Sequence, residues 1–339
     1  MKDAPETSIL IPVYNREHLI GPCIESALSQ SVPDLEVVVV DNASTDGTWS
    51  VCERYARQDP RVRVFKNDRN IGPVLNWKRC FDEARGRFGK VLFSDDLMAP
   101  AFLEKALPLL SNPEVGFVFS SIELGPEPGR PQTVYWWKPS TGTYPSRTFI
   151  ESSICGISIP VSPGAGLFRM DDLRKHLMLE IPSPTGREFA SHGAGPDVLL
   201  YLLTARAYPK VGYVADPVSF FRAHGGSITE QESGNDKIWE HHYQAKVWFA
   251  ETGEADGAPP TGRLLGMCLA HGWTRHVKRY KERLPTEQFA ARFAAAPAPI
   301  PLSAQWNVYW YRFKARMARK LEAAFGGPPA PDRSLFDRG

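Results

Sequence analysis

Short apolar runs alternate with segments of helical spacing over the first 120 residues, and this alternation limits the fold more than any other feature. The expected strands are 8–13, 36–40, 62–66, 91–94 and 115–120, and the expected helices are 17–30, 45–58, 74–84 and 101–110. Strands that are apolar on both faces and separated by helices are typical of a parallel sheet that is covered on both sides. We therefore predict an α/β fold with a mostly parallel sheet flanked by helices.

The remaining sequence is patterned differently. Residues 125–147 are rich in proline and glycine and predict a long surface excursion. A loop over 154–168 is expected to lead to a strand, and a helix over 196–205 to precede a short strand over 211–214. From about residue 236 the pattern is helical as far as residue 325.

Acidic side chains follow two of the predicted strands. Asp41 ends the second strand, and the adjacent Asp95 and Asp96 follow the apolar run 91–93. Ligands of open α/β sheets bind at the carboxyl ends of the strands, so these acids are expected to share one site. Neighbouring carboxylates repel each other, and a divalent cation removes this penalty. The pair therefore predicts a Mg²⁺ or Mn²⁺ site, although capping of the helix after Pro100 explains it equally well in isolation.

The bulk composition narrows the class of protein. A formal net charge of +2 gives no indication of nucleic-acid binding. The five cysteines are scattered without CxxC spacing, which indicates reduced thiols rather than a zinc ribbon or a disulfide framework. Residues 1–7 are polar and predict no signal peptide, and no apolar run approaches the roughly 20 residues of a membrane span. We expect a cytoplasmic protein with at most peripheral membrane contact.

Five motifs in order carry a family resemblance: IPVYNR at 11–16, VDNASTDGT at 40–48, NIGPVLNWK at 70–78, FSDD at 93–96 and RAHGGS at 222–227. Over about residues 7–230 the chain resembles the family 2 glycosyltransferases of the GT-A fold. The resemblance implies an inverting, nucleotide-sugar-dependent enzyme of the hexosyltransferase type with a Rossmann-like sheet. The implied organisation is a GT-A catalytic domain over 1–235, with a nucleotide-sugar-binding half at 1–120 and an acceptor and catalytic half at 121–235. A helical C-terminal region over 236–325 and a flexible tail over 326–339 would follow.

The resemblance implies a set of donor contacts. Asp41 would accept the imide N–H of a uracil or thymine ring, which favours UDP or TDP over GDP. Gly72 lets the backbone approach a phosphate closely, at a helix start that favours anions. The expected contacts are Pro12, Val13, Tyr14, Asp41, Gly72, Asn76, Lys78, Ser94, Asp95, Arg222 and Ser227. Asp41 also fits a turn residue before Ser44, and Lys78 also fits a solvated position on a helix.

The metal ligands and the catalytic base follow from the same resemblance. Asp95 matches the metal-binding acid of the DxD motif, and His224 would be a second ligand of Mn²⁺ or Mg²⁺. Phe93 replaces the first acid of that motif, so the usual contact with the donor is not expected here. Asp197 matches the base that deprotonates the acceptor, and Glu188 is the rival base. An N-cap role explains Asp197 as well.

The acceptor side is less strongly marked. Trp136, Trp137, Gly164 and Glu188 are expected to shape it, because aromatic faces suit sugar rings, although packing within the 125–147 excursion explains the tryptophans equally. The implied acceptor is a hydroxyl of a glycan or lipid-linked glycan in surface polysaccharide or lipopolysaccharide-type synthesis.

The helix expected over 306–325 has an apolar stripe and many cations. The stripe is Trp306, Tyr309, Trp310, Phe313, Met317, Leu321 and Phe325, and the cations are Arg312, Lys314, Arg316, Arg319 and Lys320. A basic amphipathic helix with Trp and Tyr is typical of a membrane interface, here the inner face. Packing on the domain core or on a second subunit of a homodimer is the alternative.

Other functional classes are weaker. A sugar nucleotidyltransferase needs a glycine-rich, basic loop after the first strand, whereas this chain has YNRE at 14–17. A non-catalytic nucleotide-sugar or lipid-carrier binding protein is suggested by Phe93 and Pro196, which replace expected acids. No GxGxxG follows the first strand, so a dinucleotide oxidoreductase is disfavoured.

Overall fold

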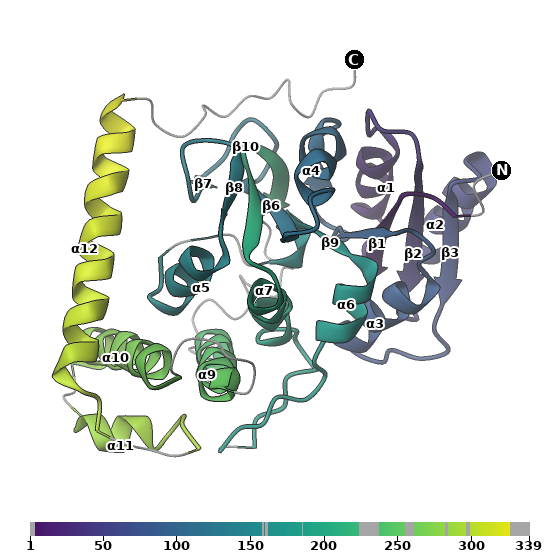
Figure 1. The fold of residues 1–339 in the computed structure, drawn as a ribbon. Helices are drawn as coiled ribbons and strands as arrows, with labels where there is room; N and C mark the ends of the chain where they lie inside the picture. The colour runs from purple at the N-terminus through teal and green to yellow at the C-terminus, as the bar shows by residue number, and fades with distance from the viewer. Residues whose placement is uncertain are drawn as a thin grey trace.

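A computed structural model describes residues 4–157, 159, 162–184, 186–223, 237–254, 261–281, 284–295 and 299–325 of the 339. Its centre is one sheet in the order β3-β2-β1-β4-β9-β6-β10-β5, with β7 beside β6 and β8 beside β10 (Figure 1). The strands are β1 (Thr7–Val13), β2 (Leu35–Asp41), β3 (Val62–Lys66), β4 (Phe88–Val91), β5 (Leu97–Met98), β6 (Val115–Gly125), β7 (Thr133–Tyr135), β8 (Gly142–Pro145), β9 (Gly166–Arg169) and β10 (Lys210–Arg222).

The sheet is mostly parallel, as predicted. Strands β3, β2, β1 and β4 run parallel to one another, and β6 runs parallel to β10. Between these two groups lies β9, which is antiparallel to both β4 and β6. The expected α/β class, with helices flanking the sheet and a helical C-terminal region, is confirmed.

Helices cover both faces of the sheet. They are α1 (Ile20–Leu28), α2 (Thr48–Gln58), α3 (Pro73–Glu83), α4 (Phe102–Leu110), α5 (Ser146–Ile154), α6 (Met170–His176) and α7 (Pro196–Ala207). Ile9 and Ile11 of β1 pack in one core with α1, α2 and α4, whereas Leu10 packs in a second core with α3, α6 and α7. Successive side chains of a strand point to opposite faces, so β1 contributes to both cores.

Three local predictions are wrong. Strand β4 spans Phe88–Val91 and ends at the first residue of the expected strand 91–94, because the chain turns where the Asp96 N–H donates to the Phe93 carbonyl. Residues 125–147 are not simply a surface excursion, since β8 pairs with β10. Strand β10 is longer than 211–214 because it continues past Pro217 through a register shift between Val214 and Ser219.

The C-terminal helices form a group of their own. They are α9 (Lys237–Glu251), α10 (Thr261–Tyr280), α11 (Thr286–Ala290) and α12 (Leu302–Phe325), with a short 3₁₀ turn, η2 (Thr252–Glu254), after α9. Helix α9 packs on α7, α10 packs on α9, and α12 packs on α10, at the far edge from β3 (Figure 1). Among the described residues, no helix is both long and apolar enough to span a bilayer. The expected tail lies outside those residues.

Candidate active site

The loops after β1 and β2 are tied together at the carboxyl edge of the sheet. Asn15 and Ala43 have left-handed backbones, with φ of 51° and 60°. The Asn15 side-chain oxygen accepts from the Thr45 N–H at 2.9 Å, and the Asn15 N–H donates to the Ser44 hydroxyl at 2.9 Å. Tyr14 is exposed beside them, whereas Pro12 and Val13 are buried in β1. Tyr14 is thus the part of this segment that can face a ligand.

Asp41 lies fully buried at the end of β2. Its carboxylate accepts from the Ser44 N–H at 3.2 Å and from the Ser44 hydroxyl. The Lys66 ammonium lies 3.9 Å from the second carboxylate oxygen. The turn role that the sequence left open for Asp41 therefore exists, and any contact with a base is additional to it.

A network of buried amides supports the start of α3. Asn76 is 2 % exposed, accepts from the Asn67 amide at 2.8 Å and donates to the Val40 carbonyl at 3.0 Å. The same Asn67 amide group donates to Asn42 at 3.0 Å. Gly72 precedes α3 with φ of 84°, a conformation that favours glycine. Asn76 thus holds the loop in place, and the Gly72 carbonyl accepts from the Asn42 amide at 3.3 Å in the same network.

The acidic pair lies in the turn after β4, and its two members differ. Asp96 is buried and accepts from the Arg222 N–H at 3.0 Å. Burial, followed by the charge of Asp95, raises the pKa of Asp96 well above its usual value. The Asp95 carboxylate is more exposed and lies 3.7 Å from the Arg16 guanidinium. Asp95 is therefore the acid that can reach a cation, and Asp96 anchors the turn to β10.

A buried lysine beneath this turn was not found from the sequence. Lys90 in β4 is 0 % exposed, and its ammonium donates to the Val91 carbonyl at 3.1 Å and to the Gly164 carbonyl. Burial lowers its pKa to about 7, and the charge of Asp96 opposes this shift. A lone lysine within an apolar strand was the available signal. Lys90 fixes the turn η1 (Pro163–Ala165), which contains Gly164, under the acidic pair.

Asp197 stands in the first turn of α7. One oxygen of its carboxylate accepts from the Gly195 N–H at 2.8 Å and from the Val198 N–H at 2.6 Å. His242 of α9 places Nε2 at 2.8 Å from the other oxygen. Gly195 is the N-cap of α7, so the N-cap role that the sequence left open for Asp197 is wrong, although its carboxylate does accept a first-turn N–H group. The Asp197 side chain is 16% exposed. His242 was missed because 45 residues separate it from Asp197 in the sequence, so no local spacing links them.

The loop before α7 packs against the acidic turn. Gly193 has φ of 76°, and a Cβ there would lie 2.6 Å from the Trp77 ring. Trp77 in turn contacts Phe93, with ring centroids 5.5 Å apart. The chain of contacts Gly193–Trp77–Phe93 therefore links the loop that leads to Asp197 with the turn that carries Asp95.

Several other predicted site residues are engaged elsewhere. Trp137 is 4 % exposed, donates from its indole to Ser152 at 3.2 Å and packs in an aromatic cluster, so its faces are covered. Trp136 is half-buried. Lys78 is exposed and pairs with Asp82 at 2.7 Å, as a solvated helix residue would.

The rival base caps its own turn. The Glu188 carboxylate accepts from the Ala190 N–H at 2.7 Å, and hydrogen bonding from Ser191 leads the effects that lower its pKa. Ser94 is buried beside the acidic pair. His224 and Ser227 lie outside the described residues.

The divalent cation implied by the family resemblance would find few protein ligands here. In the part of the chain that the structure describes, no three His, Cys, Asp or Glu side chains gather as metal ligands. Mg²⁺ and Mn²⁺ keep several waters and bind substrate phosphates, so one outward carboxylate is enough protein ligation. Asp95 fits that limited role.

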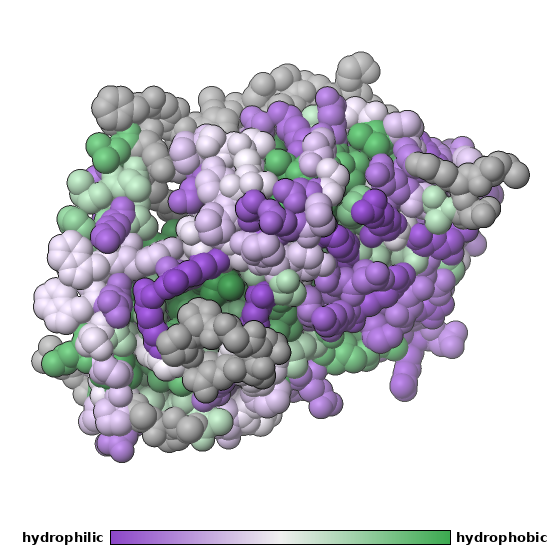
Figure 2. Space-filling model, in the orientation of Figure 1, coloured by the Kyte–Doolittle hydropathy of each residue, from purple (hydrophilic) through white to green (hydrophobic). Residues whose placement is uncertain are grey.

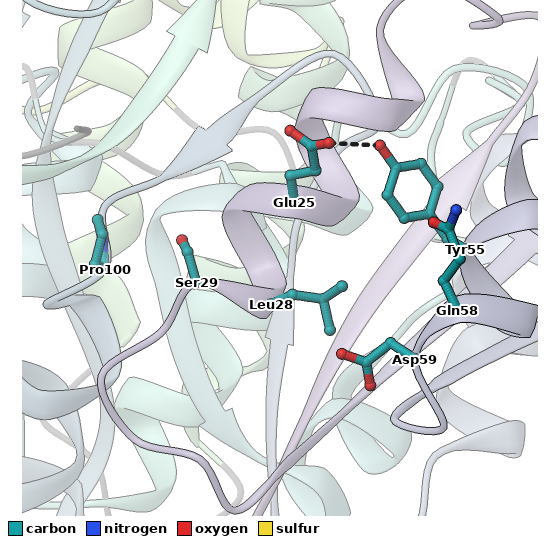
Figure 3. A pocket seen from close by; sticks show the side chains of 7 residues that line it. All are labelled: Glu25, Leu28, Ser29, Tyr55, Gln58, Asp59 and Pro100. Carbon is teal, nitrogen blue, oxygen red and sulfur yellow. Dashed lines mark hydrogen bonds between the residues drawn. The ribbon is translucent and has the colours of Figure 1, made fainter. Parts of the chain in front are cut away.

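Two surface hollows lie at different edges of the sheet. One of about 490 Å³ lies between the C-terminal ends of α1 and α2, where Tyr55 donates to Glu25 at 2.7 Å, and no predicted site residue lines it (Figure 3). The other, about 590 Å³, lies past the end of β3 and is lined by Lys66, Asn67, Asp68, Arg69, Ile71 and Arg79. The second hollow adjoins Asp41 through Lys66 and is therefore the one next to the candidate site.

The fold and the strand-end acids define an α/β protein with a candidate ligand site at the carboxyl edge of its sheet, and comparison with known proteins gives the family. The model of "Glycosyl transferase family 2" matches residues 8–177, half of the chain. The chain belongs to glycosyltransferase family 2.

Curated relatives match the chain in part. A Bacillus subtilis protein provisionally named the teichuronic acid biosynthesis glycosyltransferase TuaG is 31% identical over 140 residues, which are 41% of this chain and 56% of that protein. The chondroitin synthase of Escherichia coli is 37% identical over 108 residues, which are 32% of this chain and 16% of the synthase. The chain thus spans about half, or less, of the length of these relatives.

Solved structures match over nearly the whole chain. Residues 1–349 of S. aureus TarS have a TM-score of 0.60 at 18% identity and cover 98% of this chain and 89% of that one. The complex of the same protein with UDP-GlcNAc has a TM-score of 0.63 at 17% identity, covering 94% and 91%. At this identity the likeness establishes the fold.

Proposed function

We propose that this protein is an inverting glycosyltransferase that moves a sugar from a nucleoside-diphosphate sugar to a hydroxyl of a glycan or lipid-linked glycan. One observation carries the proposal. An outward carboxylate, Asp95, and a carboxylate at a helix start, Asp197, belong to segments that are packed together through Trp77 and Phe93. A carboxylate that can hold a divalent cation beside the diphosphate, and a second carboxylate that can act as a base in the same region, are what a displacement at a sugar diphosphate requires.

The donor occupies the carboxyl edge of the sheet. Tyr14 lines the base with Pro12 buried behind it, Asp41 accepts the imide N–H of the base in addition to its Ser44 hydrogen bonds, and the backbone at Gly72 lies along the ribose and phosphates. UDP or TDP is favoured by Asp41, and the UDP-GlcNAc complex of the structurally similar TarS supports UDP. Asn76 supports this loop from beneath, whereas Lys78 is paired with Asp82 and is left out of the proposed donor contacts.

The reaction is a single displacement. Asp197 takes the proton of the acceptor hydroxyl, the hydroxyl oxygen forms a bond to the anomeric carbon, and the bond from that carbon to the diphosphate breaks with inversion. A Mn²⁺ or Mg²⁺ ion, which Asp95 and His224 would hold, neutralises phosphate charge when it is bound. Arg222, whose N–H donates to Asp96, is a proposed contact of the diphosphate, and Ser227, outside the described residues, is proposed as a second one.

The acceptor side is formed by the segments around Asp197. Gly164, Trp136 and Glu188 border it, whereas Trp137 supports it from the core. Relatives named for teichuronic acid biosynthesis and chondroitin synthesis support a polysaccharide acceptor. We infer a cytoplasmic enzyme of surface polysaccharide synthesis, with catalysis in residues 1–235 and a helical region over 236–325.

A screen of UDP-, TDP- and GDP-sugars for release of nucleoside diphosphate tests this function. Release is expected with Mn²⁺ or Mg²⁺ and not with a chelator, and Asp95→Asn should reduce it strongly. Lys78→Gln is the matched control and should retain release, because Lys78 is paired with Asp82. Absence of release from every donor, under all metal conditions, would overturn the assignment.

The alternative of a non-catalytic binding protein is motivated by Phe93, which packs on Trp77 where the family has an acid. Calorimetry with UDP and Mn²⁺ separates the two. Binding without turnover would favour the binding protein, and pyrophosphate release from UTP and a sugar phosphate would favour a nucleotidyltransferase.

A further inference from the structure

Helix α12 is attached to the rest of the protein by one face. Ala304 and Val308 on this face are 6 % and 4 % exposed. Tyr311 places its hydroxyl 3.1 Å from the Ser152 hydroxyl, and Arg312 contacts His271 at 2.8 Å. Packing on the domain core, one alternative that the sequence left open for this helix, is therefore found for this face. It does not explain the apolar side chains on the other face.

The opposite face carries large apolar side chains into solvent. Of the ten large apolar side chains that are exposed in the described residues, seven lie on α12, with exposed fractions of 41–73%. They form what we call the outward stripe: Leu302, Trp306, Tyr309, Trp310, Phe313, Met317 and Leu321. Each residue turns a helix by about 100°, so Trp306 lies about 160° around the helix axis from both Ala304 and Val308. Residues 302–321 give the stripe a length of about 28 Å.

Positive charge accompanies the outward stripe. Lys314, Arg316 and Lys320 are exposed along it, and the only acid in the sequence of α12 is Glu322. Figure 2 shows pale and green side chains along the outer edge of this helix, at the left of the view. Trp and Tyr rings beside cations match the boundary between lipid head groups and acyl chains.

We propose that the outward stripe of α12 docks on an anionic bilayer surface, with its rings at the head-group boundary and its cations toward lipid phosphates. A second copy of the chain fits this face less well. A two-fold interface would set the stripe against itself, and the cations of both copies would meet with one acid per helix to offset them. Anionic lipid complements the same charges.

Sedimentation of the full chain with vesicles tests the docking. We expect binding to vesicles of phosphatidylcholine with phosphatidylglycerol, little binding to phosphatidylcholine alone, and weakening by salt. The double variant Trp310→Ser/Phe313→Ser should bind at least about tenfold more weakly. Both side chains are exposed, so the fold should persist. Tyr280→Ser, which alters an exposed ring on α10, is the matched control and should bind normally.

Three outcomes would overturn this proposal. They are no binding to either vesicle, equal binding to both, or a dimer in solution that the double variant converts to a monomer. Release of nucleoside diphosphate from soluble donors should be unchanged in the double variant, so the docking and the proposed enzyme activity can fail independently.

A second, separate observation concerns His242 and rests on the proposed function. An ionised carboxylate only accepts hydrogen bonds, so the 2.8 Å contact between His242 Nε2 and the Asp197 carboxylate requires a proton on Nε2. Backbone N–H groups of Gly195 and Val198 hold the other oxygen. We infer that His242 is a positioning residue, which fixes the orientation of the Asp197 carboxylate from α9.

Kinetics of two substitutions test this role. A lost hydrogen bond to a charged group is expected to lower kcat about 10–100-fold in His242→Leu, with donor KM unchanged. His242→Gln, whose amide can donate from nearly the same place, should recover part of kcat. Equal kcat in Leu and Gln variants, or a parallel loss of donor binding and thermal stability, would overturn the role. Absence of turnover in the wild type would instead overturn the enzyme assignment.

Discussion

Gly193→Ala should destabilise the protein for two independent reasons, backbone strain and a steric clash with Trp77. The Gly193 φ of 76° is left-handed, which costs a residue with a Cβ about 1–2 kcal/mol. A Cβ would also lie 2.6 Å from the Trp77 ring, and Trp77 is only 6 % exposed, so the ring cannot swing into solvent. Overpacking of this kind costs about 1–3 kcal/mol, which gives a total of about 2–5 kcal/mol.

Two other glycines separate these costs. Gly186 has φ of 60° with nothing within 4 Å of an added Cβ, so Gly186→Ala should show the backbone cost alone. Gly142 has open space and no left-handed backbone, so Gly142→Ala should be nearly neutral.

Trp77→Phe removes the ring atom that the Cβ added by Gly193→Ala would meet. Combined with Gly193→Ala, it should therefore cost less than the sum of the two single changes.

Urea unfolding of the four single variants and the double variant gives their free energies of unfolding. Nucleoside diphosphate release should fall in Gly193→Ala as well, because the Asp197 N–H donates to the Gly193 carbonyl at 3.2 Å. If Gly193→Ala unfolds within about 0.5 kcal/mol of Gly142→Ala, the packing of this loop on Trp77 is refuted.

Three further perturbations follow from buried polar groups. Burial lowers the pKa of His176 from 6.5 to about 4 in the folded state, so its stabilisation is complete above pH 6.5 and is lost as the pH falls toward 4. His176 should make the free energy of unfolding in urea about 2 kcal/mol higher at pH 7 than at pH 5. His176→Asn should remove this contribution to the pH dependence. Glu36→Gln leaves Arg63 without its buried carboxylate partner at 2.9 Å and should cost about 3 kcal/mol in the same assay; a change under 1 kcal/mol would contradict this. Asn76→Ala should lower the free energy of unfolding by about 2 kcal/mol and weaken UDP binding, as measured by calorimetry. Unchanged UDP binding would show that the amide network does not support the donor site.

Much of the sheet was predictable because its strands are apolar on both faces. The acids at strand ends followed from the same pattern, since the carboxyl ends of parallel strands meet at one edge. The strand past Pro217 was missed because proline usually ends a strand, and here a register shift accommodates it.

The partners of the site residues were not predictable, because tertiary contacts choose them. The proton donor to Asp197 comes from α9, and the residue beneath the acidic turn is Lys90, whose pairing with Gly164 depends on how β4 meets η1. Trp137 was placed on a surface because its neighbours are proline and glycine, yet β8 folds back and buries it.

The most direct test of the account is the turnover of Asp197→Asn with the sugar nucleotide that the wild type uses. Asparagine keeps the size of the side chain but does not accept a proton, so turnover should fall at least about a hundredfold while UDP binding persists. Turnover equal to that of the wild type would contradict the central claim that Asp197 is the catalytic base.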